Sequence, residues 1–377
     1  MASRGLFVGL MSGTSIDGID AALVRIDGAA TELVATHSEP FSPDLATWCR
    51  CVAAGEDDDL DSIARLDRAL GVRFADAVIA LLASARTPTR DVIAIGSHGQ
   101  TVRHRPGAAP AECYSIQLGD PSTIAENTGI TTVADFRRRD IAAGGEGAPL
   151  VPAFHAARFG CGGSRRAIVN IGGIANATLL HGTTVLAGFD CGPGNTLLDA
   201  WTREHRGDDF DADGAWSAEH AVDPALLGAL LDDPYLQRRG PRSTGPEHFN
   251  LAWLREHLEG EVPPGMVQAT LCEFTASCIA ASLREASPEL DAVFVCGGGA
   301  RNTDLMRRLH RHLDAHRVRL GSTDELGLAP EWVEACAFAW LAQRTLAGLA
   351  GNAPAATGAA GPRVLGGIYP GRVASAD

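Results

Sequence analysis

The sequence contains no lysine: all 32 basic residues among its 377 are arginine. This absence excludes three chemistries that depend on a lysine side chain, namely the phosphate-binding lysine of P-loop proteins, the β3 lysine of protein kinases and any Schiff-base lysine. A nucleotide-binding site in such a chain would have to be built from backbone groups, carboxylates, a metal ion and arginine.

The sequence also has fewer basic than acidic residues and lacks a C-x-x-C motif. The formal net charge is −14, from 46 acidic and 32 basic residues, which argues against nucleic acid or an anionic membrane as a partner. The nine cysteines include no C-x-x-C pair, so we expect reduced thiols in a cytoplasmic protein. The apolar run that begins at Gly5 stops at Ser12, which excludes a signal peptide, and no other stretch is long enough to span a bilayer.

The most informative stretch runs from residue 167 to 201. Its alternating apolar residues predict two strands joined by a glycine-rich turn at Gly172 and Gly173, followed by a third strand. Backbone N–H groups around these glycines and Asn176 can approach a phosphate closely, as in other anion-binding nests. On this stretch alone, an ordinary hairpin is the alternative interpretation.

The third strand of this stretch ends in a carboxylate. Asp190 precedes the break formed by Gly192, Pro193 and Gly194. In open α/β sheets, active-site carboxylates commonly lie where a strand ends. We therefore predict Asp190 to be an active-site carboxylate.

A similar arrangement opens the chain, where strands are expected on both sides of a loop at residues 12–18. We expect the loop to bind phosphate through backbone and hydroxyl groups, with two carboxylates able to hold a cation or its waters. These residues are Gly13, Thr14, Ser15, Asp17, Gly18 and Asp20. Two such units, one in each half, indicate a duplicated domain with a nucleotide between the halves. A calcium loop beginning at Asp209 is rejected, because its twelfth position is His220.

Charged residues follow two further predicted strands in the first half. His98 and Thr101 lie in a polar loop after the strand at residues 91–95. A strand at residues 130–136 is expected to deliver Arg137 and Arg138 into a glycine-rich loop, where they could clamp an anionic group of a substrate. A hydrogen-bonded loop histidine and a solvated arginine run are the alternatives.

The second half ends with three further features. The strand at residues 291–296 leads into Gly297, Gly298 and Gly299, a glycine step suited to the flat face of an adenosine. Glu334 lies on the apolar face of a late helix, which favours a paired or functional carboxylate. The Ala/Gly-rich segment 351–361 is expected to be a flexible linker.

Taken together, these motifs resemble the anhydro-N-acetylmuramic acid kinase family, a member of the acetate kinase, hexokinase, Hsc70 and actin superfamily. The segments that carry the resemblance span nearly the whole chain: GLMSGTSIDGID, GSHGQTVRH, ADFRRRDIAAGGEGAPLVP, NIGGIAN, GFDCGPGN, CGGGARN and WVEACAFAWLA. At Cys191 the family more often carries threonine.

The resemblance implies an α/β fold of two RNase H-like domains, the actin-like ATPase fold, with an interdomain cleft. We place the domains at residues 1–150 and 151–377. It also implies ATP with Mg²⁺, a small anhydro-aminosugar as substrate and a homodimer. The implied reaction opens the 1,6-anhydro ring of anhydro-N-acetylmuramic acid with water and phosphorylates O6, in peptidoglycan recycling.

The resemblance assigns roles to several of these residues. Asp190 matches the general base, and the loop from Gly13 to Asp20 matches the phosphate-binding loop. We further expect Cys191 and Glu334 on opposite sides of one cleft that closes on its ligands. Two alternatives stay open: a kinase of the same superfamily for another small sugar or carboxylic acid, and a non-catalytic ATP-binding module of the actin type.

Overall fold

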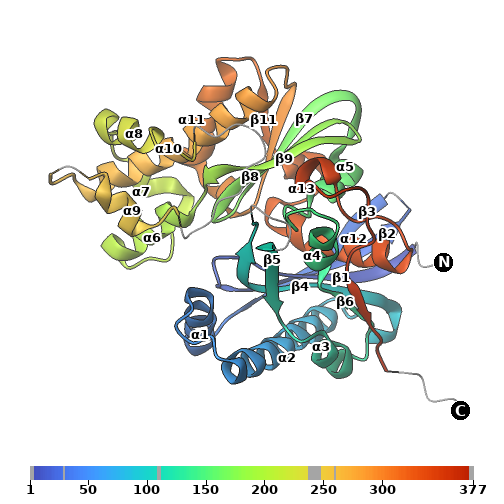
Figure 1. The fold of residues 1–377 in the computed structure, drawn as a ribbon. Coiled ribbons are helices and arrows are strands. Elements are labelled where there is room, and N and C mark those ends of the chain that lie inside the picture. Colours follow the sequence, from blue (N-terminus) through green and yellow to red (C-terminus); the bar gives the residue numbers. More distant parts are fainter. Residues whose placement is uncertain (1–3, 29, 108–111, 237–247, 259, 373–377) are drawn as a thin grey trace, which may run out of the picture. The chain divides into compact units, whose positions relative to one another are not determined.

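The computed structural model describes residues 4–28, 30–107, 112–236, 248–258 and 260–372. The chain forms two compact units (Figure 1). Unit 1 comprises residues 1–158 and 332–377, and unit 2 comprises residues 159–331. Each unit has its own mixed sheet and its own buried core.

The sheet of unit 1 has the strand order β12-β6-β4-β1-β2-β3, with β5 paired to β4. Strands β1, β2 and β3 form an antiparallel meander, and β4 and β6 run parallel to β1. The strands are β1 Arg4–Ser12, β2 Gly18–Asp27, β3 Ala30–Pro40, β4 Val92–Arg105, β5 Tyr114–Leu118, β6 Thr132–Ala134 and β12 Gly367–Tyr369.

The helices of unit 1 begin and end where local chemistry predicts. Helix α3, for example, is capped by Asp120, starts at Pro121 and stops before Gly129, whose φ is 73°. The helices are α1 Pro43–Ala54, α2 Leu60–Ser84, α3 Pro121–Thr128, α4 Phe136–Ala142, α5 Pro152–Phe159, α12 Val333–Leu346 and α13 Pro354–Thr357.

The sheet of unit 2 has the order β11-β10-β7-β8-β9. Along the chain, β7, β8 and β9 form an antiparallel meander, and the later strands β10 and β11 run parallel to β7. Its strands are β7 Cys161–Ile171, β8 Ile174–Gly182, β9 Thr184–Pro193, β10 Ala292–Cys296 and β11 Arg319–Ser322, and its helices are α6 Thr196–Arg206, α7 Ala215–Ala218, α8 Pro224–Leu231, α9 Leu251–Glu256, α10 Pro264–Ala286 and α11 Thr303–Asp314. The five strands of unit 2 follow the same order as β6-β4-β1-β2-β3 of unit 1, to which unit 1 adds β12 and β5. This shared core confirms the α/β fold and agrees with a duplication.

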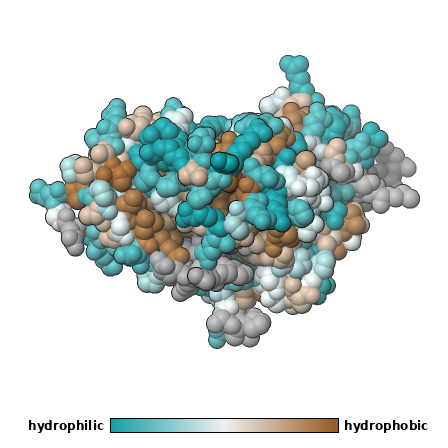
Figure 2. Space-filling model, turned by 90° about the horizontal axis from the view of Figure 1, so that it is seen from above, coloured by the Kyte–Doolittle hydropathy of each residue, from teal (hydrophilic) through white to brown (hydrophobic). Residues whose placement is uncertain are grey.

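Helix α10 is long and apolar enough to cross a membrane, but 78% of its most apolar window is buried inside the structure. It packs against β8, β9 and α11, as the core helix of a globular unit does. On the face seen in Figure 2, hydrophilic residues predominate and hydrophobic residues are interspersed among them, as is usual for protein surfaces.

Four expectations about the chain need correction. His98 and Thr101, which were expected in a polar loop after residue 95, lie within strand β4, which continues to Arg105. Helix α12 belongs to unit 1 and not to the C-terminal half: it packs on β1 and β4 so closely that a Cβ at Gly9 would overlap the Ala335 carbonyl oxygen. The expected strand at residues 130–136 is only Thr132–Ala134, because helix α4 begins at Phe136. The expected linker at residues 351–361 is folded, with α13 in it and Asn352 and Thr357 buried.

Candidate active site

The first loop connects the end of β1 to the start of β2 in unit 1. Its backbone is held from the neighbouring strand, because the Gln100 side-chain amide donates to the Gly13 carbonyl oxygen at 3.1 Å. Thr14, Ser15 and Asp17 are exposed, and the Ser15 hydroxyl donates to Asp17 Oδ1 at 2.9 Å. The loop therefore presents hydroxyl and carboxylate groups to solvent from an anchored backbone.

The two carboxylates expected near this loop lie in different surroundings. Asp17 belongs to the exposed loop itself, whereas Asp20 is half-buried within β2 and its Oδ1 accepts a hydrogen bond from the Ser38 hydroxyl at 2.7 Å. Gly18 is the first residue of β2 and packs against β3, where a Cβ would lie 2.5 Å from the Glu39 carbonyl oxygen. Asp17 is the better placed of the two carboxylates to meet a ligand at the loop.

Three of the expected substrate-binding residues meet in unit 1. His98 lies on β4, Arg137 on α4 and Glu334 in the first turn of α12. Arg137 Nη2 lies 2.8 Å from His98 Nε2, and the His98 ring lies 4.8 Å from that of Phe338, centroid to centroid. Because the guanidinium can only donate, His98 Nε2 accepts this hydrogen bond and the ring is neutral.

Burial sets the charge states in this cluster, which we call the His98–Arg137–Glu334 cluster. Burial, reinforced by the positive charge of Arg137, lowers the pKa of His98 to about 3. Burial also lowers the pKa of Arg137 to about 10, although the negative charges of Glu334 and Asp140 oppose the shift. Arg137 thus remains a cation at neutral pH and faces a neutral histidine and a carboxylate.

Of the arginine run, only Arg137 is directed into the cluster. It donates from Nη1 to the Gly147 carbonyl oxygen at 2.7 Å. Arg138 and Arg139 are exposed on α4, and Arg138 Nε lies 3.4 Å from Asp135 Oδ1. Because α4 is a helix, consecutive arginines point in different directions. The prediction of a strand followed by a loop could not show which of them points into the cluster.

Thr101 belongs to a polar ladder across β4 and β5 that sequence reasoning missed. Gln117 Nε2 donates to Thr101 Oγ1 at 3.1 Å and to Ser115 Oγ at 2.7 Å, and His104 Nδ1 lies 3.2 Å from Ser115 Oγ. Burial, followed by the charge of Arg137, lowers the pKa of His104 to about 4. The signal in the sequence was the period-2 spacing of Ser115 and Gln117 in an otherwise apolar strand.

In unit 2, the Gly172–Gly173 loop is fixed by the start of α6. The N–H groups of Gly194 and Asn195 donate to the carbonyl oxygens of Gly173 and Gly172, both at 2.8 Å. The side chain of Asn195 also donates to the Ile171 carbonyl oxygen at 3.2 Å. The loop carbonyls are thereby engaged on the protein side, which orients the loop.

The glycine step after β10 lies against the same loop, because β7 and β10 are parallel and end at one edge of the sheet. Gly297 has a φ of 80°, and a Cβ there would overlap Asn170 Oδ1. Gly299 packs on Ile171, whereas Gly298 is exposed. The structure therefore brings the two predicted glycine segments of unit 2 together.

Asp190 continues a row of polar residues across this sheet. Asn176 is its register partner on β8, and Asn170 is the partner of Asn176 on β7. Register partners project from the same face of a sheet, so these three side chains share one face. Asp190 is half-buried, and the Tyr235 hydroxyl donates to its carbonyl oxygen at 3.3 Å.

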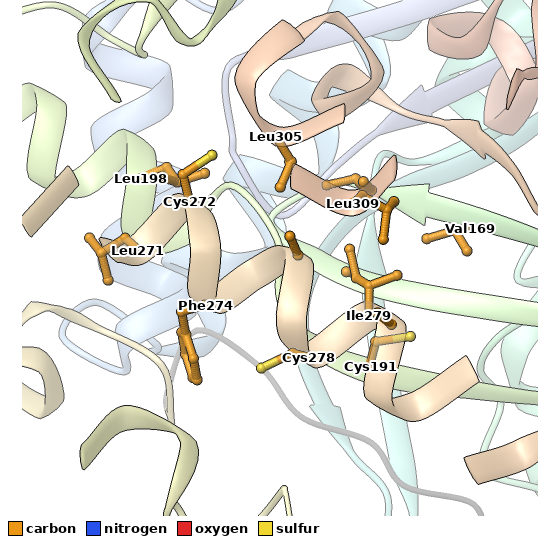
Figure 3. Packing of buried hydrophobic residues seen from close by; sticks show 14 of the residues in the cluster. Val169, Cys191, Leu198, Leu271, Cys272, Phe274, Cys278, Ile279, Leu305 and Leu309 are labelled. Atoms are coloured by element: carbon orange, nitrogen blue, oxygen red, sulfur yellow. The ribbon is translucent and has the colours of Figure 1, made fainter. Parts of the chain in front are cut away.

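The expectation for Cys191 is wrong. Its side chain is fully buried in the hydrophobic core of unit 2, beside Ile279 of α10 (Figure 3). Ala175 pairs with Gly192 and Asn176 with Asp190, so Cys191 is the extra residue of a β-bulge, and its burial follows from packing in the core. Cys191 fills the core of unit 2 and is not exposed at its surface.

Comparison with known proteins now identifies the family. The sequence model of the anhydro-N-acetylmuramic acid kinase family matches residues 5–371. The chain belongs to this family. It is 50% identical to the anhydro-N-acetylmuramic acid kinase of Pseudomonas paraeruginosa, over 97% of this chain and 98% of the relative, and 51% identical to that of Xanthomonas campestris, over 97% of each.

Solved structures show more distant similarity. The activator of 2-hydroxyisocaproyl-CoA dehydratase from Clostridium difficile, solved with bound ADPNP, is 12% identical, with a TM-score of 0.47 over 90% of this chain and 94% of the activator. A ROK family glucokinase from Streptomyces griseus, solved with glucose and AMPPNP, is 14% identical, with a TM-score of 0.40 over 89% of this chain and 99% of the glucokinase. The family assignment rests on the sequence matches, which make the chain a kinase that uses ATP and a small sugar.

Proposed function

We propose that the chain hydrolytically opens 1,6-anhydro-N-acetylmuramic acid and phosphorylates its O6 with ATP, which yields N-acetylmuramic acid 6-phosphate and ADP for peptidoglycan recycling. The observation that carries this proposal is the position of Asp190, on the polar face of the unit 2 sheet and in register with Asn176. The family match over residues 5–371 supports the same reaction.

Asp190 is the general base in this proposal. Its carboxylate takes one proton from a water molecule as the water oxygen bonds to the anomeric carbon. The bond between that carbon and O6 breaks, and O6 accepts the γ-phosphoryl group of ATP. The second proton of the water stays on the new anomeric hydroxyl, so atoms and charges balance.

Backbone and hydroxyl groups bind the nucleotide in our proposal. The loop formed by Gly13, Thr14, Ser15, Asp17 and Gly18 would hold phosphates. The glycine segments of unit 2, Gly172 and Gly173 with Asn176 and Gly297–Gly299, would hold phosphate and adenosine. Their support is geometric: an anchored backbone with small residues allows a ligand to approach closely.

The residues present fit Mg²⁺ as a companion of the phosphates. The described part of the chain has no group of three or more His, Cys, Asp or Glu side chains that could hold a metal alone. Mg²⁺ commonly binds one or two carboxylates together with substrate phosphates and waters. Asp17, and Asp20 more remotely, would contact its water shell, and the ion would supply charge neutralisation on the phosphates.

The His98–Arg137–Glu334 cluster would bind the sugar. Arg137 can pair with the lactyl carboxylate in a bidentate manner, and it is better placed than the exposed Arg138. Neutral His98, Thr101 and Glu334 would hydrogen-bond hydroxyl and acetamido groups. If the substrate were another small sugar or a carboxylic acid, it would have to bind the same pair of charged side chains, the Arg137 cation and the Glu334 carboxylate, with different groups.

Phosphorus NMR tests the proposal directly. The chain is incubated with the anhydrosugar, ATP and Mg²⁺, and a sugar 6-phosphate resonance should grow in proportion to ADP. A panel of other sugars and carboxylic acids should release little ADP. If another member of the panel gave product and the anhydrosugar gave none, that compound would replace the anhydrosugar as the proposed substrate.

We also propose a cytoplasmic homodimer, on the family resemblance, and sedimentation of the purified chain tests the dimer.

A further inference from the structure

The segment 351–363 has a defined structure. The Gly351 N–H donates to the Arg363 carbonyl oxygen at 2.9 Å, and the Arg363 N–H donates to Asn352 Oδ1 at 2.7 Å. Between them, Thr357 ends the short helix α13. This segment is a closed loop with an internal polar anchor.

The anchor's partner is Asp140 of α4, a carboxylate with no solvent exposure. Its Oδ1 accepts from Asn352 Nδ2 at 2.8 Å and from Thr357 Oγ1 at 2.9 Å. Its Oδ2 accepts from the Gly147 N–H at 3.0 Å. Three donors on one buried carboxylate satisfy the requirement that a buried charge be hydrogen-bonded.

Gly147 links Asp140 to Arg137 through its two backbone polar groups. Its N–H binds Asp140, while its carbonyl oxygen accepts from Arg137 Nη1. Two further backbone bonds hold the same loop to the C-terminal segment, from the Glu146 N–H to the Thr357 carbonyl oxygen and from the Ala360 N–H to the Ala143 carbonyl oxygen, both at 2.8 Å. The glycine-rich loop 143–147 is therefore clamped between Asp140 and segment 351–363.

We infer that Asp140, braced by Asn352 and Thr357, is a positioning residue that sets the orientation of the Arg137 guanidinium toward the substrate carboxylate. The inference rests on the proposed function, in which Arg137 binds the lactyl group. Bidentate pairing requires the plane of the guanidinium to match that of the carboxylate. A loop carbonyl that moves by about 1 Å would lose that match and with it much of the binding.

Asp140→Asn is the primary test. The amide offers one acceptor oxygen where the carboxylate offers two, and its NH₂ group would face a donor on one side. The KM for the anhydrosugar should rise about tenfold, while the KM for ATP should stay within about twofold. Asp211→Asn is the matched control, because Asp211 is also a buried carboxylate, which accepts from the N–H groups of Trp216 and Ser217 at 2.9 Å in unit 2. It should lower the melting temperature without a selective effect on sugar KM.

A double-mutant cycle separates positioning from general damage. If Asp140 acts through Arg137, Asp140→Asn should change sugar KM by less than about twofold in an Arg137→Ala background. Multiplicative effects of the two substitutions, or an equal rise of both substrate KM values, would overturn the inference. Should Asp140→Asn fail to fold, Thr357→Val removes one donor to Oδ1 at nearly constant shape and should raise sugar KM about threefold, again only when Arg137 is present.

The wild-type chain distinguishes the two possible failures. Absence of sugar phosphate from wild type would overturn the proposed function and this inference with it. If wild type turns over normally but the effects of Asp140→Asn and Arg137→Ala on sugar KM multiply in the double mutant, only the positioning role of Asp140 would be overturned. Hydrogen exchange gives an independent readout: the peptide that contains Gly147 should exchange faster in Asp140→Asn, and unchanged exchange would also contradict the clamp.

Discussion

The two units share one strand order but present different chemistry where corresponding strands end. After β7 and β10, unit 2 offers the glycines at 172–173 and 297–299, held by backbone hydrogen bonds. The corresponding strands of unit 1 are β1 and β4. Strand β1 leads into the loop that begins at Gly13, β4 carries His98, and Arg137 lies on α4 after β6. The duplicated scaffold thus carries a glycine-containing loop after the first strand of each copy, but after the next strand unit 2 has a glycine step where unit 1 has a side-chain cluster. The backbone loops suit a nucleotide, and the charged cluster of unit 1 suits an anionic sugar.

The largest effect should come from the one carboxylate on the polar face of the unit 2 sheet. Asp190→Asn keeps shape but removes the base, so turnover should fall by about 10² to 10⁴ with little change in ATP affinity. Steady-state kinetics and calorimetry measure the two quantities. Asp208→Asn, at an exposed residue near Arg206 in the same unit, is the control and should leave turnover unchanged.

Turnover of Asp190→Asn within about threefold of wild type would show that unit 2 contributes only its backbone cradle. The base would then have to be sought elsewhere. The two units would then differ more sharply, because all catalytic side chains would lie in unit 1.

The next effect should appear in unit 1, where the comparison predicts dependence on one arginine. Arg137→Ala should raise sugar KM by about 10- to 100-fold, the value of hydrogen bonds to a charged group. Arg138→Ala should leave it within about twofold, because this side chain is exposed and paired only with Asp135 at the surface. Equal effects of the two substitutions would show that the run acts through its summed charge and not through a positioned guanidinium.

Local chemistry predicted the glycine loops, the strand-end carboxylate and the helix ends such as Asp120 with Pro121. Each of these depends on residues close together in sequence. Segment 351–361 was predicted as a linker because its composition is Ala- and Gly-rich. Its order comes from Asp140, more than 200 residues away, which no local pattern reveals.

Three other errors have different origins. The start of α4 could not be fixed from Val133 and Ala134, since a short apolar run is compatible with either strand or helix. For Cys191, alternation along β9 could not decide, because the strand has a β-bulge at this residue and the thiol is buried by tertiary packing. The placement of α12 in unit 1 depends on tertiary packing alone.

A smaller effect should distinguish glycines that the fold needs from glycines that a ligand needs. Gly298→Ala has room, because its Cβ would lie 4.0 Å from Asn195 Nδ2, so stability should hold while ATP affinity falls about tenfold. In Gly194→Ala, the Cβ would overlap the Gly172 carbonyl oxygen, which should cost about 1 to 3 kcal/mol of unfolding free energy. Thermal unfolding and calorimetry on both variants check this contrast. Unchanged ATP affinity in Gly298→Ala would remove the glycine step from the nucleotide site.

The smallest effect concerns how acid affects the two units. Burial lowers the pKa of His98 and His155, both in unit 1, to about 3. In unit 2, burial favours a higher pKa for Glu273 and Asp304, but hydrogen bonds from Arg308 outweigh it and lower both values.

Each group makes the unfolded state bind more protons than the folded state, so the stability of both units decreases as the pH is lowered, but over different pH ranges. The histidines act below their unfolded pKa of about 6.5, and the carboxylates only below about 4.5. Between pH 7 and pH 6, each buried histidine should therefore cost unit 1 about 0.7 kcal/mol. Hydrogen exchange of α5 and of α10 over this range should show protection falling in α5 first.

His155→Leu should reduce the pH-dependent loss in unit 1 by that amount, whereas His310→Leu, at an exposed residue of unit 2, should not alter it. Because the comparison is between two pH values for each variant, any constant destabilisation by the substitution cancels. An unchanged pH slope in His155→Leu would mean that this ring is protonated in the folded chain as readily as in the unfolded one, and that His155 does not contribute to the acid sensitivity of unit 1.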